Sequence, residues 1–112
     1  MLFRARVGVR RGHSESVNSE TEKPFEVADI VKLLKKAPGI TVMDDPSKKI
    51  YPTPLDCDGK YDTFVGRIRR DSTVPNGLNM WVVSDNLLKG AALNAVQIAE
   101  TLVQKGLHAR KM

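Results

Sequence analysis

An antiparallel hairpin is the feature of this sequence that most narrows the folds open to it. Residues 63–69 have the alternation of a β-strand, with Phe64 and Ile68 predicted on one face. The turn that follows ends in Asn76-Gly77, a dipeptide typical of tight hairpins. Residues 78–83 form the predicted return strand, and its unbroken apolar end indicates burial on both faces. The chain is therefore expected to build a sheet around this hairpin.

A second strand is predicted at the front of the chain. Between residues 3 and 10 every second residue is apolar, which predicts one packed face and one face that carries guanidinium groups. Gly12 then permits a turn that presents His13. Arg6 and His13 would place a fixed cation and a titratable imidazole at one sheet edge, where they could hold an anion and move a proton. The alternative is a solvated basic strand with a loop histidine.

Two helices are predicted from apolar spacing. The first follows Pro24, places its apolar residues at i, i+3, i+4 and i+7 from Val27, and ends at Ala37-Pro38-Gly39. The second is opened by the side-chain oxygens of residues 84–86, continues at helical spacing from residue 88 to 103, and stops at Gly106. We expect both helices to pack on the sheet.

The remaining segments are less regular. Residues 14–22 contain Val17 as the one sizeable apolar side chain, so a strand there would be an exposed or edge strand. Residues 40–43 are a short predicted strand, and 44–60 a long loop of the kind that is often functional. Together, the predicted strands and helices indicate an α+β fold with an antiparallel or mixed sheet. Residues 1–106 would form one domain and 107–112 a frayed tail.

Composition limits the class of protein. The net charge of +5 is partly concentrated at the front of the chain, which would attract nucleic acid or an acidic small molecule. Aromatic residues are few and are not interleaved with basic ones, which argues against nucleic-acid binding. The single cysteine excludes an internal disulfide and fits a cytoplasmic location. No apolar run reaches membrane-spanning length, and the arginine-rich start has the period of a strand, not of a targeting peptide.

Four separated blocks carry a family resemblance. They are RVGVRRGHSE (6–15), YPTPLD (51–56), FVGRIR (64–69) and NGLNMWVVSDN (76–86), the last continuing into KGAALNAVQIA (89–99). In this order they resemble the C-terminal part of aspartate-semialdehyde dehydrogenase, the NADP-dependent enzyme that reduces aspartyl phosphate to aspartate semialdehyde for lysine, threonine and methionine synthesis. The resemblance implies an incomplete C-terminal domain like that of glyceraldehyde-3-phosphate dehydrogenase, and a homodimer in the complete enzyme.

The resemblance also implies roles for individual residues. His13 matches the family's acid/base histidine, and Arg6 matches the arginine that binds the carboxylate of the substrate. Asn86 falls where a polar side chain contacts NADP. The match implies no metal ligand. These residue types suit these roles, because imidazole titrates near neutrality and guanidinium grips a carboxylate with two hydrogen bonds.

Other parts of the family's machinery do not match. The family's glycine-rich nucleotide loop, cysteine nucleophile and substrate-positioning glutamine belong to a region that would precede Met1, so the NADP-binding domain is expected to be absent. Cys57 lies between Asp56 and Asp58, which would raise the pKa of its thiol, and it is not expected to be the nucleophile. Three interpretations remain: an enzyme portion that is inactive alone, a non-catalytic dimerisation module, and a small basic nucleic-acid binder.

Overall fold

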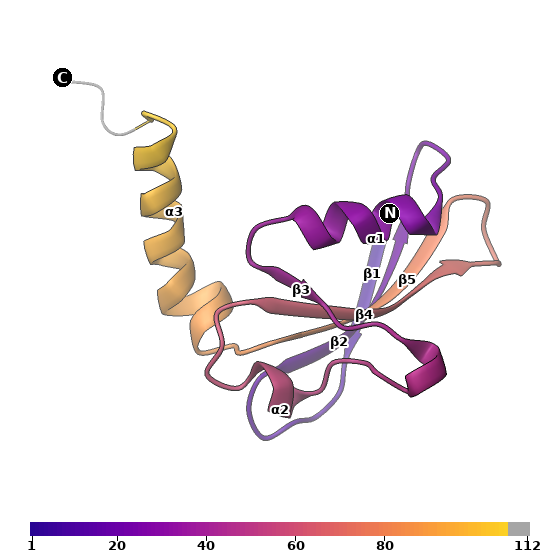
Figure 1. Ribbon diagram of the computed structural model, residues 1–112, viewed down its shortest axis with the longest axis horizontal. Helices are drawn as coiled ribbons and strands as arrows, with labels where there is room; N and C mark the ends of the chain where they lie inside the picture. Colours follow the sequence, from indigo (N-terminus) through magenta and orange to yellow (C-terminus); the bar gives the residue numbers. More distant parts are fainter. Residues whose placement is uncertain (108–112) are drawn as a thin grey trace.

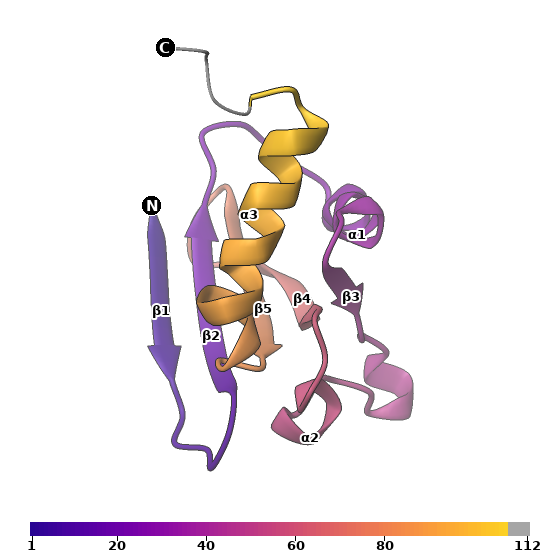
Figure 2. The same ribbon diagram turned by 90° about the vertical axis from the view of Figure 1, so that its left-hand side faces the viewer.

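The predicted hairpin lies at the centre of the fold. In the computed structural model, which describes residues 1–107, β4 (Thr63–Asp71) pairs antiparallel with β5 (Gly77–Ser84). β2 (His13–Glu20) pairs antiparallel with the other edge of β5, and β1 (Leu2–Arg6) pairs with β2. β3 (Ile40–Val42) runs parallel to β4, which gives a mixed sheet in the order β1-β2-β5-β4-β3 (Figures 1 and 2).

Each face of this sheet carries its own apolar cluster. α1 (Val27–Lys36) covers one face, where its predicted apolar stripe packs over Val65, Ile68 and Leu78. On the other face Cys57, Phe64 and Val83 cluster beside the segment that contains η1 (Pro46–Lys48) and α2 (Pro54–Cys57). β5 has apolar neighbours on both sides, and Val83 is fully buried, which confirms its predicted two-sided packing. The predicted end of α1 before Pro38 and the predicted strand at β3 are confirmed as well.

A bulge in β4 corrects the predicted placement of two core residues. The strand holds one extra residue between Gly66 and Arg69, and Arg67 has a left-handed φ of 54° there. The extra residue reverses the alternation of side chains beyond it. Phe64 and Ile68 therefore belong to the two separate clusters, and the prediction that they share a face is wrong.

The front of the chain also differs from its prediction. β1 ends at Arg6 instead of continuing through residue 10, and all five of its residues are exposed, so its predicted packed face is wrong. β1 takes the edge of the sheet and β2 lies inside it, where Ser14 is buried. The prediction of an edge strand after His13 is wrong because β2 pairs on both sides, with β1 and with β5.

The last helix begins later than predicted and stands away from the sheet. The backbone of Lys89, Gly90 and Ala91 is not helical, so α3 runs from Leu93 to Gln104 after the irregular turn η2 (Leu88–Ala92). Figure 1 shows α3 projecting from one end of the sheet, so of the two predicted helices it is α1 that packs on the sheet. Apolar side chains of α3 are exposed, among them Val96, Ile98 and Val103.

The predicted stop of α3 is confirmed. Gly106 has a φ of 64°, its amide donates to the Val103 carbonyl at 3.0 Å, and the amide of Leu107 donates to the Leu102 carbonyl at 2.8 Å. This pair of bonds is the Schellman arrangement, which satisfies carbonyls at a helix end. Of the predicted tail, residues 108–112 lie outside the described residues. Within residues 1–107, no helix has the length and apolarity to cross a membrane.

The tight packing around Gly66 makes a stability prediction. A Cβ at this position would overlap the Met43 carbonyl oxygen and lie 2.5 Å from Pro52 Cδ. We expect Gly66→Ala to lower the free energy of unfolding by about 1–3 kcal/mol, the usual cost of overpacking, in a urea titration. Gly8→Ala is the matched control, because a Cβ there has no atom within 4 Å. Equal unfolding midpoints for the two variants would contradict the packing described above.

Candidate functional site

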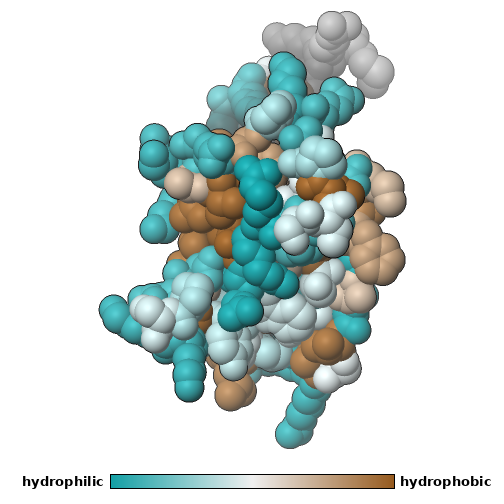
Figure 3. Space-filling model, turned by 90° about the vertical axis from the view of Figure 1, so that its right-hand side faces the viewer, coloured by the Kyte–Doolittle hydropathy of each residue, from teal (hydrophilic) through white to brown (hydrophobic). Residues whose placement is uncertain are grey.

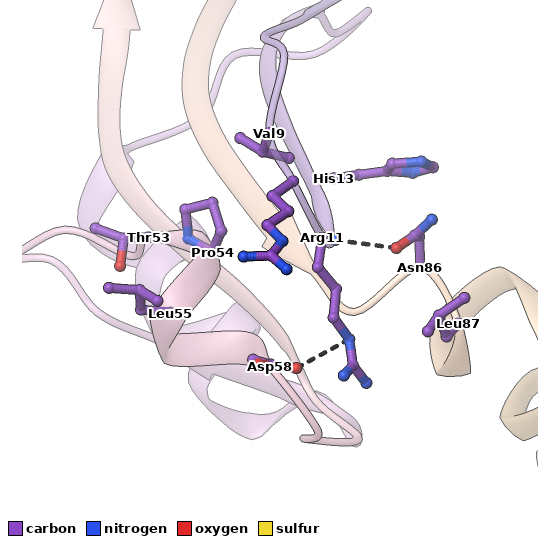
Figure 4. Close-up of a pocket in the computed structure, with 11 residues that line it drawn as sticks. Val9, Arg11, His13, Thr53, Pro54, Leu55, Asp58, Asn86 and Leu87 are labelled. Carbon is purple, nitrogen blue, oxygen red and sulfur yellow. Dashed lines mark hydrogen bonds and ion pairs between the residues drawn. The ribbon is translucent and has the colours of Figure 1, made fainter.

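An open pocket of about 1060 Å³ lies where β2 begins and β5 ends. Three segments frame it: the loop before β2, the residues at and around α2, and the turn after β5 (Figure 4). Two of the three segments come from the sequence blocks that include His13 and Asn86, and both side chains line the pocket. The sheet hydrogen bonds bring these residues together although they are 73 positions apart in the chain.

His13 is the first residue of β2 and is half-buried. It pairs with Ser84, the last residue of β5, and this pairing places it at the end of the sheet. The predicted turn before it is confirmed, since Gly12 has a φ of 87°. A Cβ on Gly12 would lie 3.1 Å from the Ser84 carbonyl oxygen, so a small residue is needed for this close approach. The imidazole is thus presented at the pocket by a tightly packed glycine turn.

Arg6 lies outside the pocket but on the same face of the sheet as His13. It is directly opposite Glu15 in the β1–β2 pairing, and Glu15 and His13 are two residues apart on β2. The Arg6 Nε donates to Glu15 Oε1 at 2.8 Å, and the side chain of Arg6 remains 52% exposed. Arg4 Nη1 lies 3.9 Å from the other oxygen of Glu15. The structure therefore brings the two predicted residues to one face, with a carboxylate beside the guanidinium.

Asn86 has a contact that the sequence did not indicate. Its Oδ1 accepts a hydrogen bond from the Gly12 amide at 3.0 Å (Figure 4). The side-chain oxygen of Asn86 therefore holds the turn that precedes His13. An amide side chain has two N–H donors besides this oxygen, and these remain chemically suited to acceptors on a ligand in the pocket.

Two further residues of this region, Asp85 and Arg11, were not recognised from the sequence as site residues. Asp85 is fully buried, and its carboxylate accepts hydrogen bonds from the Gly59 amide at 2.8 Å, the Leu87 amide at 2.9 Å and the Arg11 guanidinium at 2.9 Å. The amide of Gly59, followed by that of Leu87, lowers the pKa of Asp85 below its ordinary value, and Arg11 adds to this effect. An acidic residue directly after a strand that is predicted to be buried on both faces is the sequence signal that could have revealed Asp85.

Cys57 lies in surroundings that favour its neutral thiol. The residue is fully buried at the end of α2, and its Sγ donates to the Pro54 carbonyl at 3.3 Å. Burial raises the pKa of the thiol, and the charge of Asp85 raises it further. The predicted direction, a raised pKa of the thiol, is confirmed, but Asp56 and Asp58 contribute less to it than burial does. Within residues 1–107 there is no cluster of three acidic, histidine or cysteine side chains arranged to hold a metal ion.

Comparison with known proteins identifies the family. Residues 3–89 match the family model described as semialdehyde dehydrogenase, dimerisation domain. The chain belongs to this family. The aspartate-semialdehyde dehydrogenase of Bacillus subtilis (strain 168) is 56% identical over 103 residues, covering 91% of this chain, and that of Aquifex aeolicus is 52% identical with the same coverage. The chain spans 30% of the length of each of these relatives.

Solved structures agree with this membership of the semialdehyde dehydrogenase family. Aspartate semialdehyde dehydrogenase II of Vibrio cholerae, complexed with ASA, has a TM-score of 0.76 and 42% identity over 84% of this chain and 27% of its own. The Candida albicans enzyme with NADP has a TM-score of 0.69 and 31% identity over 90% of this chain and 32% of its own. The predicted α+β class, with a mixed sheet that is part of a larger domain, is confirmed.

The reactivity of Cys57 tests whether its thiol is buried and has a raised pKa. Because burial favours the neutral thiol, the reactive thiolate forms only at a pH above the ordinary pKa of cysteine. We expect slow alkylation by iodoacetamide at pH 7 and a rate that keeps rising with pH beyond the ordinary pKa of cysteine, followed by mass spectrometry. The same chain unfolded in urea is the control, and its thiol should react faster at every pH. A fast and pH-independent reaction of the folded chain near neutrality would show that Cys57 is activated.

Proposed function

We propose that this chain is the C-terminal portion of an NADP-dependent aspartate-semialdehyde dehydrogenase. The proposed reaction is the reductive dephosphorylation of aspartyl phosphate to aspartate semialdehyde, in the cytoplasm, on the route to lysine, threonine and methionine. The observation that carries the proposal is the 56% identity over 91% of this chain to an enzyme of that name, in a region that includes the His13 pocket. The position of the half-buried His13 in the pocket lining, on the same face of the sheet as Arg6, supports it.

His13 is proposed as the general acid and base. An imidazole changes charge near neutral pH and can transfer a proton in either direction during one catalytic cycle. Its place at the pocket gives it access to a bound substrate. The chain would supply this proton-transfer group, whereas the thiol that attacks the substrate would come from the part of the enzyme that this chain does not match.

Arg6 is proposed as the anchor of the substrate carboxylate. Its Nε is engaged by Glu15, which fixes the plane of the guanidinium and leaves the Nη1 and Nη2 edge for a second carboxylate. Two parallel hydrogen bonds from this edge would hold the amino-acid end of the substrate beside His13. Glu15 thus supports the proposed role, because it orients Arg6 through one nitrogen only.

Asn86 is proposed to contact NADP, which supplies or accepts the hydride when bound. Its side-chain oxygen is held by Gly12, so its N–H groups are the ones that suit acceptors of the nucleotide. One amide is a small part of a dinucleotide site, and most of that site would lie in the remaining part of the enzyme. Cys57 does not take part, since its thiol is buried and its pKa is raised.

A non-catalytic dimerisation module is the second candidate. It is favoured by the description of the matched family model and by uncovered apolar side chains. The two candidates share one expectation, that the complete protein is a homodimer. They differ in whether His13 and Arg6 affect turnover.

Kinetics of a chimera separate the two candidates. The part of the Bacillus subtilis relative that precedes the aligned region is joined to this chain, and NADPH formation from aspartate semialdehyde, NADP and phosphate is measured. We expect Arg6→Lys chiefly to raise KM, because it keeps the charge but loses the bidentate fork. His13→Asn should lower kcat by about 10²–10⁴-fold, the usual contribution of general acid/base catalysis.

Arg4→Lys is the matched control, since Arg4 is exposed on the same face and approaches the same glutamate, and its kinetics should match those of the wild type. The 112-residue chain alone should form no NADPH, because it lacks a reactive nucleophile. Wild-type kinetics in both Arg6→Lys and His13→Asn would refute the catalytic roles and favour the dimerisation module.

Self-association of the isolated chain is also expected. Within residues 1–107 the outer edge of β1 is unpaired, Leu2 and Phe3 on it are exposed, and α3 has several exposed apolar side chains. Figure 3 shows further apolar patches between hydrophilic side chains at the end of the molecule opposite α3. Open strand edges and apolar patches favour association. Sedimentation velocity should give a weight-average mass that rises with concentration, and a constant monomer mass across a hundredfold range would contradict this expectation.

A further inference from the structure

We propose that Asp85 is a positioning residue for His13, which it serves by tying together the three segments that frame the pocket. This inference rests on the proposed catalytic role of His13. Asp85 itself lies fully buried behind the pocket wall and is not among the residues that line the pocket.

The three hydrogen bonds of the Asp85 carboxylate reach three different segments. Arg11 belongs to the loop before β2, Gly59 follows α2, and Leu87 belongs to the turn after β5. These are the same three segments that line the pocket. One buried carboxylate therefore fixes the spacing of all three walls.

The link from Asp85 to His13 is short. Arg11 is two residues before His13, and the intervening Gly12 is held by Asn86, the residue next to Asp85. Within residues 1–107 the structure records no hydrogen bond to the imidazole of His13, so the polar side-chain contacts nearest to it in the chain are those that hold the turn before it. Residues 85 and 86 thus hold both residues that precede His13.

The position of Asp85 suits a carboxylate because the three groups that hydrogen-bond to its side chain are all donors. One oxygen of Asp85 accepts from Gly59 and Arg11, and the other accepts from Leu87. An asparagine would replace one acceptor oxygen with an NH₂ group and turn a donor toward another donor. Arg11 also pairs with Asp58 at 2.9 Å, so the loop before β2 is held by two carboxylates, one buried and one exposed.

The chimera described above tests the proposal through Asp85→Asn. We expect kcat to fall by about 10–100-fold with KM within about twofold of the wild type, because small misplacement of a catalytic group costs up to about a hundredfold in rate. If Asp85 acts through His13, Asp85→Asn added to His13→Asn should cost no further rate. A general structural defect would instead lower the rate of both backgrounds by the same factor.

Asp71→Asn is the matched control. Asp71 also accepts a backbone amide in a turn, that of Thr73 at 2.9 Å, but it lies at the far end of the β4–β5 hairpin. Asp71→Asn removes one negative charge, as Asp85→Asn does, and should leave kcat unchanged. Should Asp85→Asn fail to fold, Arg11→Gln tests the exposed end of the same link and should lower kcat in the same direction.

Hydrogen exchange in the 112-residue chain tests the positioning without any assay of activity. We expect the Gly12 amide, whose recorded hydrogen bond is to Asn86, to exchange at least about tenfold faster in Asp85→Asn, while amides of the β4–β5 hairpin keep their rates. Unchanged exchange at Gly12, or wild-type kcat in the Asp85→Asn chimera, would overturn the proposal. An inactive wild-type chimera would count against the proposed function alone, and the exchange experiment would still decide the role of Asp85.

Discussion

The rest of the structure depends on the burial of β5 on both of its faces. β5 pairs with β2 along one edge and with β4 along the other, and its two faces meet separate apolar clusters. Full burial of a side chain such as Leu78 or Val83 stabilises a fold by about 1.5–3 kcal/mol, so a strand with apolar contacts on two faces is held firmly. Because β5 is firmly held, the residues that directly follow it also have a fixed position. The pocket is built at that end, where a rigid strand can place Asp85 and Asn86 accurately.

Under the proposed function, the chemical work is divided between this chain and the remaining part of a longer enzyme. This chain holds a titratable imidazole and a guanidinium on one sheet face, and its one thiol is buried and protonated at neutral pH. The proposed proton-transfer group and carboxylate anchor would be useful only beside a nucleophile and a hydride carrier. The relatives are more than three times as long as the matched region, which agrees with a site completed by residues outside it.

Local patterns in the sequence predicted the elements whose packing is itself local. The apolar stripe of α1, the Asn76-Gly77 hairpin and the glycine turn before His13 are set by neighbouring residues, and all three were found. The bulge in β4 was missed because the Asp44 carboxylate holds it from 23 positions away, accepting from the Arg67 amide at 3.0 Å. The pattern at residues 84–86 predicts a helix cap but not the buried role of Asp85 for a related reason: two of its three donors come from distant segments.

The pairing of β2 with β5 has a kinetic consequence. It joins residues 13–20 to residues 77–84, whereas β4 and β5 are joined by a short turn. Contacts between residues far apart in sequence close long loops, and a high contact order slows folding. The β4–β5 hairpin can form early from local contacts, and β2 must then find an edge that is presented about sixty residues later in the chain. Because the pocket lies at the end of the β2–β5 pairing, its assembly is tied to the slowest contacts of the sheet.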